Sequence, residues 1–405
     1  GRKGISLIWE MSVKYAVSEF PGPPQNLINH IGHNCKYMKQ VAKITLFTII
    51  LLICLLGIEI LASKIVSTEQ FNDKINISDE SIEFYKSHIA DVHHLRGLYN
   101  DWWKSTENPC NAIFSIVAPF RKTQNNILIQ GDSWAEQFEK EISKKALTKF
   151  ASEKQVGIIN AGTTSYAPSV MTTQLRKLRQ QFNIHPTHII AIIDQSDIGD
   201  ELCRYSVRRS FDLSNRLVSV RPEPFESNEP YKLEPFFRKQ AILRSDKFAL
   251  LKLFESIALK IQHIIIREKT RCKWTDIVRP LLNGISKEEE EDFISAVNRY
   301  IDEVFSDNRV KSLQIIAHPH RSHFSKNPRN RYVLYTGKLI KLALRSNKHS
   351  QKVILLDFLN QDIGSYLINP AQEIFREGDP ASHLRDEVYG TKLTPRILAE
   401  LEKQL

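Results

Sequence analysis

The sequence predicts an α/β fold: a doubly wound, flavodoxin-like parallel sheet of about five strands, preceded by an N-terminal transmembrane helix. Three observations support this prediction. From residue 126 onward, short apolar runs alternate with amphipathic helical segments, a pattern typical of sheets that helices cover on both faces. Polar loops follow most of these runs, and ligands bind at such strand ends in doubly wound sheets. A nearly uncharged segment lies close to the N-terminus.

The uncharged segment is "ITLFTIILLICLLGIEILAS", residues 44–63, in which Glu59 is the single charge. Its length matches ~30 Å of hydrocarbon at about 1.5 Å per residue. Three lysines precede it closely, whereas acidic residues dilute the lysines that follow. The positive-inside rule therefore predicts a cytoplasmic segment 1–43, a single-pass membrane anchor and an extracytoplasmic C-terminal domain. A cleaved signal peptide is the alternative, although Ile60-Leu61-Ala62 lacks the small–x–small pattern of cleavage sites.

The composition is that of a folded protein with a basic surplus. Hydrophobic residues make up 42% of the chain, and the formal net charge is +10. The cations are mixed with 46 acidic residues and form no basic stripe, so we expect no nucleic-acid partner. Attraction to an anionic membrane or polysaccharide explains the charge equally well. The five cysteines have no zinc-site spacing, and the three beyond residue 63 allow one disulfide at most.

The predicted strands follow one another along the α/β domain, with amphipathic helices between them. The strands are NILIQ (126–130), VGIIN (156–160), HIIAIID (188–194), SLQIIAHPH (312–320) and VILLDFL (353–359). The expected core faces of the helices are Trp134, Phe138, Ile142 and Phe150; Met171, Leu175, Leu178 and Phe182; and Phe293, Val297, Ile301 and Val304. A final helix is expected around 391–404.

We expect a polar, partly helical spacer at 64–125 and the α/β domain at 126–405. The third and fourth strands are too far apart in the chain for one crossover. An insertion is therefore predicted at about 201–310, with a hairpin at 211–225 and a helical segment at 232–268. Insertions that follow strand ends often shape a substrate mouth.

The loops at the strand ends hold the candidate site residues, among which we expect Asp132 to fix its loop by hydrogen bonding and not to be catalytic. These residues are Gly131, Asp132 and Ser133 after the first strand, Gly162 after the second, Ser196 and Asp197 after the third, and Asp379 and His383 after the last. A serine is a weak nucleophile unless a base removes its proton and a carboxylate orients that base. Ser133, His383 and Asp379 are the candidates for these three roles.

At these loops the chain resembles the SGNH, or GDSL-type, hydrolase family. Gly131-Asp132-Ser133 matches the first block of the family, and Gly162 in "NAGTTSY" matches the second. The family's last block, Asp-x-x-His before the final helix, corresponds to Asp379 and His383. The resemblance covers roughly residues 126–400. It implies serine-dependent removal or transfer of acyl groups, often acetyl esters on carbohydrate, with no metal or other cofactor.

Two positions depart from the family pattern. Gln195-Ser196-Asp197 stands where the third block has asparagine, so Ser196 occupies the place of an oxyanion donor. The expected oxyanion hole is then the Ser133 and Gly162 N–H groups with Ser196, and the Gln195 amide is the alternative donor. Asp379 lies four residues before His383 instead of three. One helical turn would still bring them together.

Simpler interpretations remain for several of these residues. Ser133 is also suited to be a helix N-cap, and Gly162 to permit a turn. Asp194, Asp197 and Asp200 suit either helix capping or a hard metal ion. His318 and His320 point the same way if the strand continues, which would suit a metal pair, but no carboxylate accompanies them in the sequence.

The sequence therefore predicts a membrane-tethered serine esterase or acyltransferase acting on acyl, foremost acetyl, esters of an envelope glycan or a related ester. The alternative is a catalytically degenerate module that binds polysaccharide and scaffolds envelope assembly. The altered third block favours that alternative.

Overall fold

The computed structural model of the chain describes most of the α/β domain and one long N-terminal helix. It describes residues 25–72, 113–120, 125–220, 242–243, 245, 247–269, 272–360 and 374–405. The chain divides into two compact units, residues 1–69 with 247–253 and residues 70–246 with 254–405.

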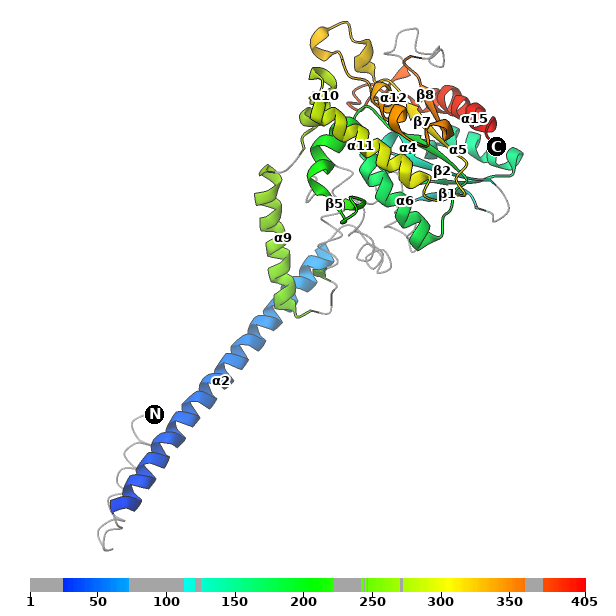
Figure 1. The fold of residues 1–405 in the computed structure, drawn as a ribbon. Helices are drawn as coiled ribbons and strands as arrows, with labels where there is room; N and C mark the ends of the chain where they lie inside the picture. Colours follow the sequence, from blue (N-terminus) through cyan, green and yellow to red (C-terminus); the bar gives the residue numbers. More distant parts are fainter. Residues whose placement is uncertain are drawn as a thin grey trace. The chain divides into compact units, whose positions relative to one another are not determined.

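Within the described residues, six strands form the central sheet of the larger unit, in the order β1-β3-β2-β4-β7-β8 (Figure 1). Their bounds are Ser115–Ala118 (β1), Asn126–Gly131 (β2), Gly157–Asn160 (β3), His188–Ile192 (β4), Ser312–Ala317 (β7) and Val353–Asp357 (β8). The strands from β2 onward are parallel. In chain order they run 2-1-3-4-5, the flavodoxin-like arrangement, and the order reverses between β2 and β4. The predicted fold class and all five predicted strands are confirmed.

β1 lies within the range predicted as a spacer. It pairs antiparallel with β3, Ser115 opposite Asn160. The sheet therefore begins before residue 126. Residues 73–112, which make up most of the predicted spacer, lie outside the described residues.

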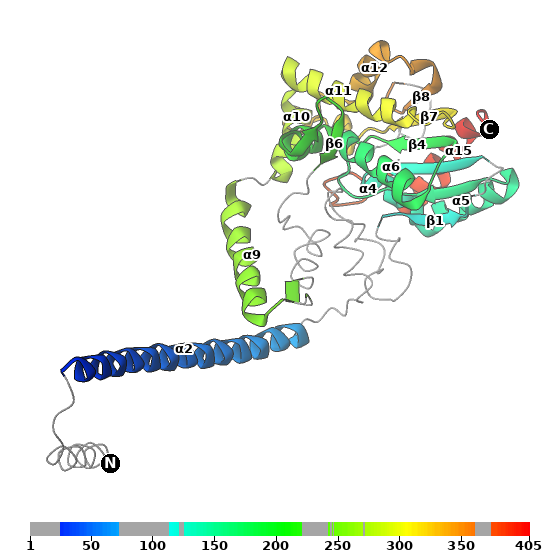
Figure 2. The ribbon, with the colours of Figure 1, turned by 60° about the horizontal axis from the view of Figure 1, so that its bottom comes forward.

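Helices cover both faces of the sheet, and alternate residues of each strand serve the two cores. Figures 1 and 2 show α6 (Pro168–Phe182), α11 (Lys287–Val304) and α12 (Thr336–Ser346) on one side, with α5 (Glu141–Lys154) and α15 (Thr394–Glu402) on the other. Leu128 belongs to the first core and its neighbours Ile127 and Ile129 to the second. Short helical turns complete the unit: α4 (Ser133–Glu136), η2 (Gln137–Glu139), α7 (Asp197–Gly199), η3 (Asp200–Tyr205), η4 (Ser206–Arg208), η6 (Arg321–Phe324), η7 (Pro328–Asn330), η8 (Ser350–Lys352), α14 (Asp386–Val388) and η10 (Tyr389–Leu393).

The predicted helix faces are mostly buried. Every expected core residue of α11 is buried, as are Met171, Leu175 and Leu178 of α6. The segment after β2 is the exception, because it breaks into α4, η2 and α5 instead of one helix. Ile142, expected in the core, is 39% exposed there. The other predicted residues of this segment, Trp134, Phe138 and Phe150, are buried, and the break at Lys140 turns α5 so that Leu147 faces inward in place of Ile142.

The predicted insertion contains the hairpin β5 (Arg209–Phe211) and β6 (Leu217–Val220), followed by α9 (Ala249–Lys269) and α10 (Trp274–Asn283). α11 packs on α6 and α12 and belongs to the sheet's helical cover, so the insertion ends before α11 and not at residue 310. A disulfide joins Cys203 and Cys272, with Cα atoms 5.9 Å apart. Residues 221–241 of the predicted hairpin and helix lie outside the described residues.

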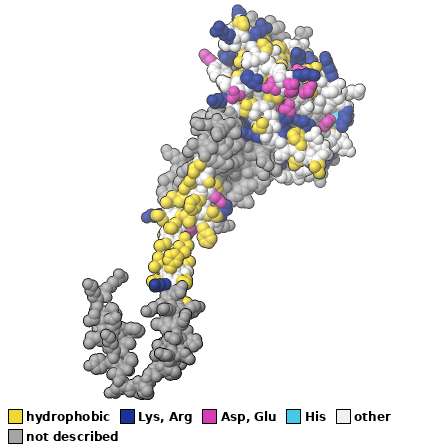
Figure 3. All heavy atoms as spheres, turned by 60° about the vertical axis from the view of Figure 1, so that its left-hand side comes forward, with side chains coloured by type: hydrophobic (Ala, Val, Ile, Leu, Met, Phe, Trp, Pro, Cys, Tyr) yellow, Lys and Arg dark blue, Asp and Glu magenta, His cyan; other side chains and the backbone are white. Residues whose placement is uncertain are grey.

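The smaller unit contains α2 (Gln25–Asn72) as far as Glu69. Its segment Val41–Val66, which includes the predicted span 44–63, is long and apolar enough to cross a membrane, and none of its most apolar stretch is buried. Figure 3 shows hydrophobic side chains covering the described part of this helix. A signal sequence shares these properties of length and composition.

Candidate active site

Gly131 ends β2 in a conformation that needs glycine. Its φ is +140°, and a Cβ there would lie 2.5 Å from the Ile192 carbonyl oxygen of the neighbouring strand. Any side chain would therefore strain the backbone and push β4 away. The chain turns at this point and begins α4 with Ser133 at its first position.

Asp132, not Ser133, is the N-cap of α4. The Trp134 N–H donates to Asp132 Oδ1 at 2.9 Å, which satisfies one of the free donors of the helix start. The interpretation of Ser133 as a cap is therefore wrong. The Ser133 hydroxyl is left for another partner at the carboxyl edge of the sheet.

That partner is His383, which lies 250 residues further along the chain. Ser133 Oγ is 2.7 Å from His383 Nε2, and His383 Nδ1 is 2.6 Å from Asp379 Oδ2. With Asp379 accepting the Nδ1–H, the Nε2 lone pair faces the serine hydroxyl. The structure thus brings the three predicted residues into one hydrogen-bonded chain.

A tight turn makes the four-residue spacing work. Ser382 N–H donates to the Asp379 carbonyl at 3.2 Å, and Ser382 has φ +54°. A bridge between Phe375 and Leu384 fixes both ends of the segment. The turn reverses the chain so that the Asp379 carboxylate meets the imidazole, where the family motif uses one residue less.

The surroundings of Asp379 keep it ionised. Burial raises the pKa of Asp379, but the hydrogen bond from His383, the charge of that imidazole and the Ala381 N–H together outweigh burial. The pKa of Asp379 therefore lies below its ordinary value. An ionised carboxylate at this place stabilises the imidazolium that forms when His383 takes the serine proton.

Gly162 is held close to α4. A Cβ at Gly162 would lie 2.6 Å from Ala135 Cβ and 2.7 Å from the Glu136 nitrogen, so packing against α4 by itself requires glycine. The Gly162 N–H donates to Asn160 Oδ1 at 2.9 Å. To serve an oxyanion, this N–H has to exchange its side-chain acceptor for the substrate.

The two candidate replacements for the family's asparagine also have partners. Ser196 donates its hydroxyl (2.7 Å) and its N–H (3.0 Å) to Asp194 Oδ2. The Gln195 amide donates to the His318 carbonyl at 2.8 Å and accepts the Thr336 N–H at 2.9 Å. Gln195 therefore links the loops after β4 and β7 to the start of α12. Ser196 has to release Asp194 before its hydroxyl can donate to an oxyanion.

A second Asp–His pair lies at the same edge of the sheet. Asp194 Oδ1 is 2.6 Å from His320 Nε2, and both side chains are almost completely buried. The Trp134 indole contacts both pairs, with its ring 5.9 Å from His320 in a stacked geometry and 5.9 Å from His383 in a tilted one. His318 packs against the same indole at 4.8 Å.

Several carboxyl groups gather under α4 and α7. Burial, together with the charges of neighbouring aspartates, raises the pKa values of Asp132 and Asp197 well above their ordinary value. Burial opposes ionisation of Asp194 as well, but the charge and hydrogen bond of His320 and the donors of Ser196 lower its pKa. Within this cluster Asp194 therefore carries the negative charge, and Asp132 and Asp197 favour the protonated form.

Neither metal interpretation gains support from the geometry. Among the described residues, no group of three or more His, Cys, Asp or Glu side chains is arranged to hold a metal ion. His318 has a pKa lowered to about 3, mainly by burial, and its Nδ1 faces the Pro319 carbonyl at 2.8 Å. Asp194 and His320 hydrogen-bond to each other instead.

Sequence reasoning missed Trp134 and the Asp194–His320 pair as parts of the site. Trp134 was expected only in the core, and nothing in its spacing indicates a contact with three imidazoles. Asp194 and His320 stand at the ends of neighbouring strands, β4 and β7. That adjacency was the available signal.

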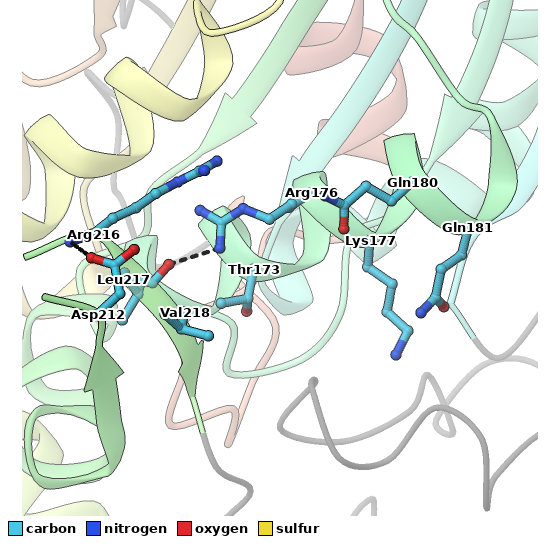
Figure 4. Close-up of a pocket in the computed structure, with 9 residues that line it drawn as sticks. All are labelled: Thr173, Arg176, Lys177, Gln180, Gln181, Asp212, Arg216, Leu217 and Val218. Atoms are coloured by element: carbon cyan, nitrogen blue, oxygen red, sulfur yellow. Dashed lines mark hydrogen bonds between the residues drawn. The ribbon is translucent and has the colours of Figure 1, made fainter. Parts of the chain in front are cut away.

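A separate surface pocket lies between α6 and the β5–β6 hairpin (Figure 4). It has a volume of about 320 Å³ and is lined by Thr173, Arg176, Lys177, Gln180, Gln181, Asp212, Arg216, Leu217 and Val218. Arg176 donates to the Leu217 carbonyl at 2.7 Å and pairs with Glu303 at 2.6 Å. These contacts hold the Arg176 guanidinium against the hairpin and α11. The pocket contains none of the triad residues.

Comparison with known proteins finds structural but no sequence relatives. No family model matches the chain, and no curated protein matches its sequence. Solved structures that resemble it include LAE5, an α/β hydrolase enzyme from the metagenome of Lake Arreo, Spain (11% identity, TM-score 0.35, covering 67% of this chain and 94% of that one). They also include a variant of Axe2, an acetyl-xylooligosaccharide esterase from Geobacillus stearothermophilus (10%, 0.36, 69% and 96%), and the psychrotrophic esterase EstA from Pseudoalteromonas sp. (10%, 0.31, 69% and 96%). Similarities at this level assign no residue role to this chain.

Proposed function

We propose that the protein is a membrane-tethered serine ester hydrolase or acyltransferase of SGNH type. Its substrates would be acyl esters, foremost acetyl esters, of an envelope glycan or related molecule. The observation that supports this most is the hydrogen-bonded chain from Ser133 through His383 to Asp379. The position of Ser133 where the strand order reverses is the second support, because ligands of doubly wound sheets bind there.

In the proposed reaction, Ser133 Oγ attacks the ester carbonyl while His383 Nε2 accepts the hydroxyl proton. The tetrahedral intermediate collapses, the C–O bond to the alcohol breaks, and His383 returns the proton to the leaving alkoxide. The acyl group is then bound to Ser133. Water, or a hydroxyl of an acceptor, then attacks the carbonyl of this acyl-serine while His383 takes its proton. The bond between the acyl carbon and Ser133 Oγ breaks, and His383 returns the proton to Ser133 Oγ. Water gives hydrolysis, and an acceptor hydroxyl gives transfer.

The oxyanion would be held by backbone donors at the start of α4. Ser133 is the first residue of that helix, so its N–H has no acceptor one turn earlier in the helix. The Gly162 N–H would be a second donor to the oxyanion after breaking its hydrogen bond to Asn160. The Ser196 hydroxyl would be a third after breaking its hydrogen bond to Asp194. The Ser133 N–H is the donor that needs no exchange.

The anchor and the disulfide support an extracytoplasmic location. Val41–Val66 has the length and composition of a membrane span, and Cys203–Cys272 is a bond that persists in oxidising compartments. We propose that residues after 63 face outside the cytoplasm. Protease added to spheroplasts should then digest the α/β domain, and complete protection would reverse this orientation.

The proposed activity is tested by labelling the full chain, in detergent, with a fluorophosphonate and mapping the adduct by mass spectrometry. We expect a single adduct on Ser133 that prior incubation with an acetyl ester slows. Ser133→Ala is the matched control and should take up no label. Labelling of wild type and Ser133→Ala to the same extent would remove Ser133 from the mechanism.

The existing hydrogen bonds of Ser196 and Gln195 favour a second candidate function, a non-catalytic glycan-binding module. In that role the triad geometry would survive without an adequate oxyanion site. Wild type that turns over no acetyl ester, but binds an acetylated polysaccharide in calorimetry, would favour this candidate over the hydrolase.

A further inference from the structure

Two adjoining pockets lie where α6, the β5–β6 hairpin and the turn after α11 meet. The first, drawn in Figure 4, has a volume of about 320 Å³. The second has a volume of about 530 Å³ and is lined by Arg176, Arg179, Gln180, Arg216, Glu303, Ser306, Asp307, Asn308 and Arg309. Because Arg176, Gln180 and Arg216 line both pockets, the two form one surface, the arginine groove. Each volume lies within the ~300–1,000 Å³ that is typical of ligand sites.

The arginine groove has more cations than carboxylates. Five Lys or Arg side chains line it, against three Asp or Glu side chains. Glu303 Oε2 accepts a hydrogen bond from Arg176 (2.6 Å) and another from Arg216 (3.2 Å), and Asp307 pairs with Arg309 at 2.8 Å. The carboxylates are thus shared among the arginines, and a surplus of positive charge is left in the groove to attract an anion.

The two arginines at the base of the groove are held by the scaffold. Arg176 donates to the Leu217 carbonyl of the hairpin at 2.7 Å. Arg179 donates to the Glu303 (2.7 Å) and Val304 (2.8 Å) carbonyls at the end of α11. Their side chains are only 15% and 8% exposed. These cations are therefore fixed in place without a ligand.

Arg216 and Arg309, by contrast, present their guanidinium groups to solvent, with side chains that are 58% and 52% exposed. The hairpin turn fixes the backbone of Arg216, because its N–H donates to Asp212 Oδ1 at 2.9 Å. Figure 4 shows the Arg216 side chain reaching toward Arg176. A guanidinium has five N–H donors in a planar fork that matches the oxygens of a carboxylate or phosphate. The bond to Glu303 uses one nitrogen of Arg216.

Uncharged hydrogen-bonding side chains accompany these arginines. Gln180, Gln181 and Asn308 line the groove and are exposed. An amide both donates and accepts hydrogen bonds, so it suits the hydroxyl groups of a sugar. Leu217 and Val218 are the apolar residues of the lining, too few to bury an acyl chain of a lipid.

We propose that the arginine groove binds an anionic glycan. Arg216 and Arg309 hold a carboxylate or another oxyanion of the sugar, and the neighbouring amides hold its hydroxyl groups. Two joined pockets suit a chain of linked sugars better than a single ion. The groove contains none of the triad residues, so this inference concerns binding and does not depend on catalysis by Ser133.

The test measures binding to the full chain in a neutral detergent by isothermal titration calorimetry. The probes are trimers of galacturonic acid and of mannuronic acid, with the methyl esters of the same trimers as uncharged controls. Inorganic phosphate and glycerol phosphate, the headgroup of an anionic lipid, test whether any oxyanion suffices. The binding variant is Arg216→Gln combined with Arg309→Gln. Its matched control is Arg396→Gln, which replaces an exposed arginine of α15.

We expect wild type and Ser133→Ala to bind at least one trimer with the same affinity, which weakens as salt is added. The double variant should bind it about tenfold more weakly, and Arg396→Gln should bind it as wild type does. Circular dichroism checks the fold of each variant. If the double variant unfolds, Arg216→Gln alone decides, with an expected loss of several-fold.

Absence of binding by both trimers, or equal binding by wild type and the folded groove variant, would overturn the proposal. Methyl esters that bind as tightly as the acids would do the same, because the arginines would then have no anion to recognise. Phosphate or glycerol phosphate that binds as tightly as the trimers would mean a simple anion site and would overturn the assignment to a glycan.

Discussion

Two Asp–His pairs stand at the same edge of the sheet with the same 2.6 Å separation, yet their surroundings differ. Asp379 meets His383 through Nδ1, which leaves Nε2 for Ser133. Asp194 meets His320 through Nε2, and His320 Nδ1 has no hydrogen-bond partner among the residues that the structure describes. The first pair retains slight exposure, 10% for the His383 side chain, whereas His320 has none.

The imidazole nitrogen that hydrogen-bonds to the carboxylate decides what an Asp–His pair can do. A carboxylate on Nδ1 directs the basic Nε2 at a nucleophile. A carboxylate on Nε2 in a closed core occupies the nitrogen that would face a nucleophile, so its effect falls on stability, because the buried carboxylate depends on that hydrogen bond. We therefore propose a chemical role for Asp379–His383 and support of the β4 and β7 loops for Asp194–His320.

The largest expected effect on activity comes from substituting Ser133, the hydroxyl that the first pair faces. Ser133→Ala should lower kcat for p-nitrophenyl acetate by ~10⁶-fold, since nucleophile and base act as a unit, with little change in melting temperature because Asp132 supplies the cap. His383→Ala should cost about as much, and the double variant hardly more. Esterase activity that survives in Ser133→Ala would end the hydrolase proposal.

Asp379→Asn comes next, because it leaves the base in place but disturbs its tautomer and charge. We expect a loss of ~10⁴-fold in kcat at neutral pH, smaller than that of Ser133→Ala. Steady-state kinetics of the two variants, each with its active-site concentration checked, measures the difference. A loss of less than tenfold would show that His383 needs no carboxylate, and the comparison of the two pairs would fail.

Substitutions in the second pair, Asp194–His320, should lower the free energy of unfolding. His320→Leu leaves the buried Asp194 carboxylate without its imidazole hydrogen-bond partner, which should cost about 3–5 kcal/mol in the free energy of unfolding. His320→Gln, which keeps a donor, should cost less. Urea unfolding and kcat per folded molecule separate the two effects. A kcat loss comparable to that of Asp379→Asn at unchanged stability would make Asp194–His320 part of the chemistry.

Ser196 bonds to Asp194 of the second pair, and it stands where the sequence pattern predicts an oxyanion donor for the first pair. If Ser196 releases Asp194 to donate to the oxyanion, Ser196→Ala should lower kcat about tenfold or more at constant KM, and Ser196→Asn should preserve or raise it. The pre-steady-state burst with p-nitrophenyl acetate reports the acylation step directly. Unchanged acylation in Ser196→Ala would leave Ser196 with only its structural bond to Asp194.

The smallest expected effect concerns Asp197. Burial and the charges of Asp132 and Asp194 raise the pKa of this carboxyl. A carboxyl with a raised folded-state pKa stabilises the fold at low pH, and this stability is lost as the pH rises through the folded-state pKa. Asp197→Asn never ionises, so the stability of the variant relative to wild type should increase as the pH rises. Urea unfolding at several pH values measures this, and parallel curves for both proteins would contradict it.

Much of the fold was predictable because it depends on local patterns. Apolar runs identified all five parallel strands, and their alternation with helices identified the fold class. The pattern was insufficient where tertiary contacts override it. β1 pairs at the edge of the sheet with a partially buried, unremarkable sequence, and the break at Lys140 removes Ile142 from the core although its spacing is helical.

The sequence by itself determined which residues stand at the carboxyl edge: Ser133, Gly162, Ser196, Asp379 and His383 all follow strands whose direction and burial their composition reveals. Only the tertiary structure decided what each of them touches. It joined Ser133 to His383 across 250 positions, gave the capping role to Asp132, and committed Gly162 and Ser196 to Asn160 and Asp194. The reason is physical: strand and helix periodicity is a property of neighbouring residues, whereas a hydrogen bond depends on atoms within about 3 Å that packing of the whole domain brings together.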